Sequence, residues 1–177
     1  MIINHEDNKI DGLILIENKL IKDERGFLGE IIPGGNNNPL INGKIGHIYA
    51  SVATGKHIPR GGHYHHKNID RFSLLSGSCL CLFIDYRNDN NNVYSIILGN
   101  REFKNDIGIA NFTIDKGYMI TVIVPTGVHH TFIPLTDEVV NIVSIASEAH
   151  DDNDYVKISP FEITQFSSLL ESFGIKK

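Results

Sequence analysis

Histidines and a carboxylate occur in this chain at a spacing that suits proton transfer or metal binding. His63 and His65 are two residues apart, so in an extended strand both side chains point to the same face. Asp70 follows His65 after four residues, and Gly77 follows Asp70 after six. We expect a hairpin whose second strand carries the carboxylate and ends at a turn.

A third imidazole comes from much later in the chain. Pro125 and Gly127 indicate a turn, and His130 follows Gly127 by three residues. A distant strand would therefore bring His130 to His63 and His65. Three imidazoles and one carboxylate suit Zn, Fe, Mn or Ni, and imidazoles also transfer protons near neutral pH.

Short apolar segments between turn signals would position these residues. These segments recur at even intervals with almost no helical periodicity between them, which predicts an all-β sandwich or barrel. A short C-terminal helix is expected at 167–173, ended by Gly174. The predicted strands are 12–20, 26–32, 46–53, 72–76, 78–85, 93–98, 112–114, 119–124, 131–133 and 139–147.

Length and composition are those of one ordinary domain covering residues 1–177, with 41% hydrophobic and 21% charged residues. The net charge of -5 argues against nucleic acid as a partner. No apolar run reaches the roughly 18 residues of a membrane span, and the N-terminus lacks an apolar signal segment. A cytoplasmic protein without a membrane partner is expected.

Two further features have structural interpretations. Cys79 and Cys81 alternate within an apolar segment, which predicts buried thiols rather than a disulfide. The Asn-rich stretches 34–39 and 88–92 are expected to be solvated loops.

The histidine pattern resembles the cupin superfamily, whose two motifs are H-x-H-x(3,4)-E-x6-G and P-x-G-x2-H, with Asp70 where the family usually has Glu. This resemblance implies a double-stranded β-helix, the jelly-roll cupin fold. Four segments make the resemblance more specific. In the same order along the chain, they resemble motifs of the dTDP-4-keto-6-deoxyglucose 3,5-epimerases (dTDP-4-dehydrorhamnose 3,5-epimerases). These segments are 23–30, 60–65, 85–87 and 125–132.

Two related groups share parts of the pattern. Residues 62–77 are similar to bifunctional enzymes that modify UDP-linked acetamido-4-keto sugars and place zinc at this site. Residues 146–155 are similar to nucleotide-sugar 3,4-ketoisomerases. All three groups act on a 4-keto hexose linked to a nucleoside diphosphate. The resemblance therefore implies a dTDP-, UDP- or GDP-linked sugar as substrate.

The epimerase resemblance implies catalytic roles. His63 matches the base that removes a proton next to the ketone, and Glu148 aligns with the acid that orients this base. His65 would share the proton in a ketoisomerisation. Where the epimerases have a tyrosine as proton donor, this chain has Ser144. This difference leaves three alternatives, namely epimerisation at one carbon, 3,4-ketoisomerisation, or another proton donor.

Two tyrosines, Tyr49 and Tyr118, are the candidates for such a donor, and the sequence does not rank them.

The substrate-binding candidates also come from the resemblance. Arg25 and Arg60 would bind the diphosphate, because a guanidinium can bind phosphate oxygens in a bidentate manner. Phe27 and Glu30 resemble positions that contact the nucleoside in the epimerases. His130 is the remaining candidate for substrate binding.

The resembled epimerases and ketoisomerases need no metal, so no cofactor is required. Zn or another divalent metal on His63, His65, Asp70 and His130 is the alternative. A metal-dependent oxygenase and a non-catalytic sugar-nucleotide-binding cupin are the competing functions. We expect a homodimer, because sheet edges tend to be paired and the resembled family exchanges its N-terminal strands.

Overall fold

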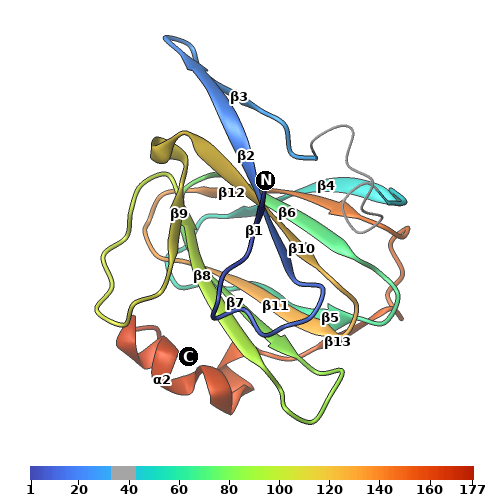
Figure 1. The fold of residues 1–177 in the computed structure, drawn as a ribbon. Coiled ribbons are helices and arrows are strands. Elements are labelled where there is room, and N and C mark those ends of the chain that lie inside the picture. The colour runs from blue at the N-terminus through green and yellow to red at the C-terminus, as the bar shows by residue number, and fades with distance from the viewer. Residues whose placement is uncertain (33–42) are drawn as a thin grey trace.

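The computed structural model describes residues 1–32 and 43–177, which form two facing β-sheets (Figure 1). In the described residues, the first sheet has seven strands in the order β1-β2-β10-β6-β12-β4, with β3 paired to β2. Its strands are β1 (Ile2–Ile3), β2 (Ile14–Asp23), β3 (Gly26–Gly29), β4 (His47–Ala53), β6 (Asp70–Ser76), β10 (Tyr118–Val124) and β12 (Val140–Ala146).

The second sheet has six strands in the described residues, in the order β13-β5-β11-β7-β8-β9. These are β5 (Arg60–His65), β7 (Ser78–Asp85), β8 (Val93–Gly99), β9 (Asn111–Thr113), β11 (Val128–Pro134) and β13 (Tyr155–Lys157). Short helical segments are η1 (Ile114–Lys116), η2 (Pro160–Glu162), η3 (Thr164–Phe166) and α2 (Ser167–Ser172).

Strand β7 is buried on both faces, which explains its continuous apolar sequence. Cys81 and Phe83 belong to the core between the sheets, whereas Leu80 and Leu82 belong to a second cluster. This alternation follows from the two-residue period of a strand. The cysteines are free and buried, with their sulfur atoms 3.6 Å apart, so the prediction of buried thiols is confirmed.

The C-terminal segment covers the outer face of the second sheet. Phe166, Leu170 and Ile175 pack in the same cluster as Leu80 and Leu82, and Figure 1 shows α2 beside β7 and β8. The predicted helix at 167–173 is confirmed. Its end agrees with the positive φ of 65° at Gly174, a conformation that glycine adopts without a Cβ clash.

The predicted all-β jelly-roll architecture is confirmed, and each predicted strand overlaps an observed one. Strand β11 begins at Val128, earlier than expected, because it pairs with both β5 and β7. Strands β1 and β13 were missed, since two or three residues carry no detectable alternation. The stretch 88–92 is a largely exposed loop, and 34–39 lies outside the described residues. No helix of the described chain is long and apolar enough to cross a membrane.

The hairpin of β2 and β3 projects from the body of the molecule (Figure 1). Glu24 and Arg25 form its two-residue tip, between Asp23 and Gly26, which are paired. Gly26 has φ of 133°, which relieves the strain of this tight connection. The hairpin therefore extends the sheet beyond the core and carries Arg25 away from it.

The 85–87 motif forms a structural ion pair at the end of β7. Arg87 donates from Nε and Nη2 to the two carboxylate oxygens of Asp85, at 2.8 and 2.7 Å, and Nη2 also reaches the Asp11 carbonyl at 2.6 Å. These contacts fasten the β7–β8 loop to the N-terminal segment. The hydrogen bonds from Arg87 lower the pKa of Asp85, against the opposing effect of its burial.

Replacing Asp85 with Asn should lower the free energy of unfolding by about 1–3 kcal/mol at pH 7, because charge-assisted hydrogen bonds are lost. A carboxylate with a lowered pKa stabilises the fold above its usual pKa, and this contribution disappears as pH falls through the lowered value. Urea unfolding should thus show the gap to wild type shrinking below about pH 4. Asp89→Asn, in the exposed loop nearby, is the control. Equal stability of Asp85→Asn and wild type at pH 7 would contradict this assignment.

Candidate active site

Four side chains from three strands converge between the sheets. Strand β5 supplies His63 and His65, β6 supplies Asp70, and β11 supplies His130. One nitrogen or oxygen atom of each lies within 4.8 Å of the others. The predicted convergence of these residues is therefore confirmed.

The route by which Asp70 arrives differs from the expectation. Strands β5 and β6 belong to different sheets, so the predicted hairpin is wrong, and the turn 66–69 crosses between the sheets. His63 and His130 are directly opposite each other in the β5–β11 pair. Gly77 ends β6 with φ of 80°, as expected for a turn.

Asp70 is the centre of this cluster and is only 1% exposed. Its Oδ2 lies 3.2 Å from Nε2 of His65 and 3.5 Å from Nε2 of His130. This oxygen has no hydrogen-bond partner in the described part of the chain. The pKa of Asp70 is lowered, because contacts with the two imidazoles outweigh the opposing effect of burial.

The hydrogen bonds of the imidazoles indicate which nitrogens face Asp70 with a lone pair. His130 places Nδ1 at 3.3 Å from the Val128 carbonyl, which can only accept, so Nδ1 carries the proton. Burial lowers the pKa of His130 to about 3. Its Nε2 is therefore unprotonated near neutral pH and faces a carboxylate oxygen. A cation between these atoms could be coordinated by the nitrogen lone pair and by the carboxylate oxygen.

The residues therefore fit a divalent metal. His63, His65, Asp70 and His130 would hold it, through imidazole nitrogens and a carboxylate oxygen, the ligands of many Zn, Fe and Mn sites. Such an ion, when bound, would supply Lewis-acid polarisation of a substrate carbonyl. Asp70 offers an unsatisfied buried oxygen for this purpose.

His63 has the properties of a base. Its ring centroid is 4.7 Å from that of His130 and 4.9 Å from that of His65. Burial, aided by the charge of His65, lowers the pKa of His63. The pKa of His65 is instead raised, because Asp70 and Asp154 outweigh burial. His63 and His130 both favour the neutral form, and of these two only His63 lines both cavities described next.

Two cavities meet at His63. The outer cavity, of about 450 Å³, is also lined by His47, Tyr155 and Lys157. The inner cavity, of about 140 Å³, is lined by apolar residues of the core, by Arg60 and by the polar side chains of Ser51, His130 and Ser144. Tyr49 and His63 line both cavities. The outer volume lies in the range of small-molecule sites.

The two candidate proton donors are separated by the structure. Tyr49 on β4 is directly opposite Ser144 on β12 and reaches both cavities. Burial, together with the charge of Asp70, raises the pKa of Tyr49 to about 12, so the hydroxyl keeps its proton. Tyr118 instead packs against the core at the other end of the sheet. Of these two candidates, Tyr49 is therefore the one that lies at the site.

Other predicted site residues lie elsewhere. Arg25 is at the hairpin tip, where its side chain is 83% exposed and pairs with Asp23. Phe27 and Glu30 are exposed beside it. Glu148 directs its carboxylate to Lys44 at 2.5 Å, not to His63 as the alignment implied.

The carboxylate that meets the histidines from this part of the chain is Asp154, which the sequence analysis missed. Its Oδ2 lies 3.0 Å from Nδ1 of His65. The ketoisomerase-like segment contains Glu148, Asp151, Asp152 and Asp154, and only the path of the loop selects among them. The sequence signal that could have pointed to Asp154 is the pair Asp154-Tyr155, which ends the segment resembling the ketoisomerases.

Comparisons with known proteins give similarity in structure only. No protein-family model matches the chain, and no curated protein matches it. The dTDP sugar isomerase from Desulfovibrio desulfuricans G20 has 15% identity and a TM-score of 0.69, covering 89% of this chain and 88% of that one.

Two further solved structures are similar in fold. The dTDP-6-deoxy-D-glucose-3,5-epimerase from Legionella pneumophila Philadelphia 1, in complex with dTDP-4-keto-L-rhamnose, has 21% identity and a TM-score of 0.66, covering 89% of this chain and 77% of that one. The sugar 3,4-ketoisomerase from Thermoanaerobacterium thermosaccharolyticum, in complex with TDP, has 19% identity and a TM-score of 0.58, covering 90% and 98%. The chain thus has the cupin fold found in dTDP-sugar epimerases and ketoisomerases.

Proposed function

We propose that this protein is an isomerase that moves a proton next to the ketone of a 4-keto-6-deoxy sugar linked to a nucleoside diphosphate. The observation that carries the proposal is the position of His63, a neutral imidazole at the junction of two cavities. The fold is shared with an epimerase bound to dTDP-4-keto-L-rhamnose. We therefore favour a dTDP- or UDP-linked sugar, and the reaction is an epimerisation at C3, C5 or both.

The chemistry requires one base and one acid. His63 takes the proton from the carbon beside the ketone, and the electrons of that C–H bond form an enolate. A proton is then returned to carbon from the opposite side, which inverts the centre. Tyr49 has a protonated hydroxyl on the wall of both cavities and is the donor that we propose in place of the tyrosine absent at Ser144.

The lining of the inner cavity suits the sugar and its phosphate. Phe72, Phe132 and Ile142 present apolar surface that would accept the 6-deoxy methyl group. Arg60 lines the same cavity, and its guanidinium would bind a phosphate oxygen pair. The outer cavity would then hold the nucleoside.

A 3,4-ketoisomerase is the second candidate, and a specific observation favours it. Residues 149–151 and 154–155 of the ketoisomerase-like segment line the outer cavity, while Ser144 removes the epimerase donor. In that reaction the proton leaves C3 and returns to C4, so His65, next to His63, would share the transfer.

Incubation with dTDP- or UDP-4-keto-6-deoxyglucose in deuterated water, followed by NMR, should show exchange. Deuterium at C3, at C5 or at both indicates epimerisation, and a ketone at C3 indicates ketoisomerisation. His63→Asn should slow the exchange about 10²–10⁴-fold, because the base is lost. The exposed His66→Asn is the matched control. Binding of the nucleotide without any exchange would support a non-catalytic protein and refute the isomerase.

Tyr49→Phe should lower kcat by about 10²-fold, since the proton donor is removed while the ring remains. KM should change little, because the hydroxyl acts on the reacting carbon. Tyr118→Phe should retain wild-type kcat. Equal turnover by the two variants would exclude Tyr49 as the donor.

We also propose a homodimer in which the β2–β3 hairpin of one copy docks on the other. Ile21 and Leu28 of the hairpin are 68% and 64% exposed, and Ile48 on the edge strand β4 is 61% exposed. Burying these apolar side chains together would stabilise the pair. The same docking would carry Arg25, Phe27 and Glu30 to the second copy, where they could bind the nucleotide.

Light scattering after gel filtration should give about twice the chain mass of 19.8 kDa. Leu28→Glu should shift the protein to monomer, because a charge would be buried at the interface. It should also weaken dTDP binding. Ile107→Glu, at an exposed apolar residue of another loop, should remain dimeric. A monomeric wild type at micromolar concentration would refute the dimer.

A further inference from the structure

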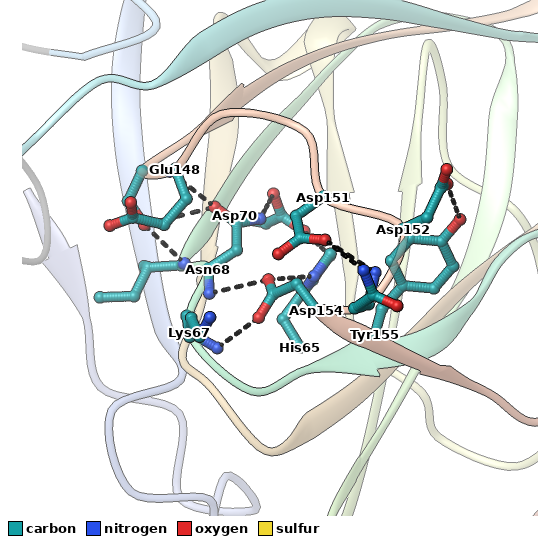
Figure 2. Close-up of polar contacts among 12 residues, drawn as sticks. His65, Lys67, Asn68, Asp70, Glu148, Asp151, Asp152, Asp154 and Tyr155 are labelled. Atoms are coloured by element: carbon teal, nitrogen blue, oxygen red, sulfur yellow. Dashed lines mark hydrogen bonds and ion pairs between the residues drawn. The ribbon is translucent and has the colours of Figure 1, made fainter.

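Asp154 is a buried carboxylate whose hydrogen bonds all go to the segment that carries the site. It is 5% exposed. Oδ2 contacts Nδ1 of His65 at 3.0 Å and accepts from the Asn68 amide at 3.2 Å, and Oδ1 accepts from the Lys67 amide at 2.8 Å. The Asp154 carbonyl accepts from the His66 amide at 2.8 Å. Figure 2 shows the carboxylate between His65 and Lys67.

Asn68 continues these contacts to the second carboxylate. Its Nδ2 donates to Oδ1 of Asp70 at 2.7 Å. Its Oδ1 accepts from the Ser147 hydroxyl at 3.3 Å and from the Glu148 amide at 3.2 Å. We call this pair of residues the Asp154–Asn68 clamp, and Figure 2 draws it with its neighbours.

The clamp orients His65 and Asp70, so that one particular atom of each faces the cluster of His63, His65, Asp70 and His130. His65 has Nδ1 directed to Asp154, so Nε2 is the nitrogen left for the cluster. Asp70 has Oδ1 bound by Asn68, so Oδ2 is the oxygen left. These two atoms lie 3.2 Å apart, and Nε2 of His130 is 3.5 Å from the same oxygen.

We propose that Asp154 and Asn68 are positioning residues that hold His65 and Asp70 as ligands of a divalent cation shared with His63 and His130. A carboxylate on the far nitrogen of a ligating imidazole fixes its tautomer and orientation and makes it a better ligand. Asn68 fixes the orientation of the Asp70 carboxylate by donating a hydrogen bond to Oδ1, which leaves Oδ2 as the oxygen that can bind a cation. This inference goes beyond the proposed isomerase, whose proton transfer requires no metal.

The clamp also joins the cation site to the wall of the outer cavity. Ser147 and Glu148 at one end of the loop, and Asp154 at the other, all bond to the turn 66–69. Ala149 and Asp151, between these ends, line the outer cavity. Cation binding should therefore order the loop, which hydrogen exchange of residues 148–153 would detect as slower exchange.

The test measures affinity for Co²⁺ and Zn²⁺ on protein first stripped with a chelator, by competition with a chromophoric chelator. Wild type should bind one ion per chain. Asp154→Asn should bind about 10–100-fold more weakly, because the amide keeps the size of the side chain but loses its charge and one acceptor. Asn68→Ala should also bind more weakly. Asp152→Asn removes a carboxylate that is 84% exposed in the same loop and should match wild type.

Two results would overturn the inference. One is a wild-type protein that binds neither ion at micromolar concentration, and the other is a folded Asp154→Asn variant with affinity within about twofold of wild type. If Asp154→Asn does not fold, Asp154→Glu provides the same comparison, since it keeps the charge but displaces the oxygens. The readout contains no sugar nucleotide, so a failure of the proposed isomerase activity leaves this result unaffected.

Discussion

The site depends on one buried charge, the carboxylate of Asp70 between the two sheets. An ionised carboxylate in a protein interior is destabilising by several kcal/mol unless partners compensate it. Asn68 satisfies one oxygen, while His65 and His130 approach the other from the facing sheet. At this place the two sheets are therefore held together by polar contacts, whereas apolar side chains pack between them elsewhere. The strands that carry these residues must keep their register for the charge to be tolerated.

The environment divides the three imidazoles into different roles. Carboxylates on both sides raise the pKa of His65, whereas burial lowers the pKa values of His63 and His130. One cluster thus contains two imidazoles that favour the neutral form beside a third, His65, whose charged form is favoured by two carboxylates. The same set of residues can support proton transfer and can offer ligands to a cation. Both activities would use His63, whose lone pair can serve only one of them at a time, and His63 and Tyr49 line both cavities.

In the proposed isomerase, Tyr49 would take the part of a proton donor that Ser144 cannot supply. Ser144 occupies the strand position where the resembled epimerases have a tyrosine, and Tyr49 lies directly across the β4–β12 pair. Opposite residues of an antiparallel pair project from the same face of the sheet. A hydroxyl from β4 can therefore reach the cavity that a side chain from β12 would have served. Tyr118, although also on a strand, lies on another part of the sheet.

Local patterns were sufficient for the longer strands and for the histidines. Alternation in β7 and the spacing of His63 and His65 follow from the two-residue period of a strand, which any local stretch of sequence expresses. Short strands such as β13 were missed because three residues cannot express it. The resemblance implied Glu148 as the carboxylate that orients a histidine, whereas the hydrogen bond to His65 depends on the path of the loop to Asp154.

What the sequence by itself determined is the set of side chains in the cluster and the β-class of the fold. The tertiary structure decided which sheet presents Asp70, which carboxylate orients His65, and that Arg25 lies at an exposed hairpin tip. The physical reason is distance along the chain. Periodicity acts over a few residues, whereas these contacts join segments up to about 90 residues apart, such as His65 and Asp154. Only the packing of the two sheets brings such segments together.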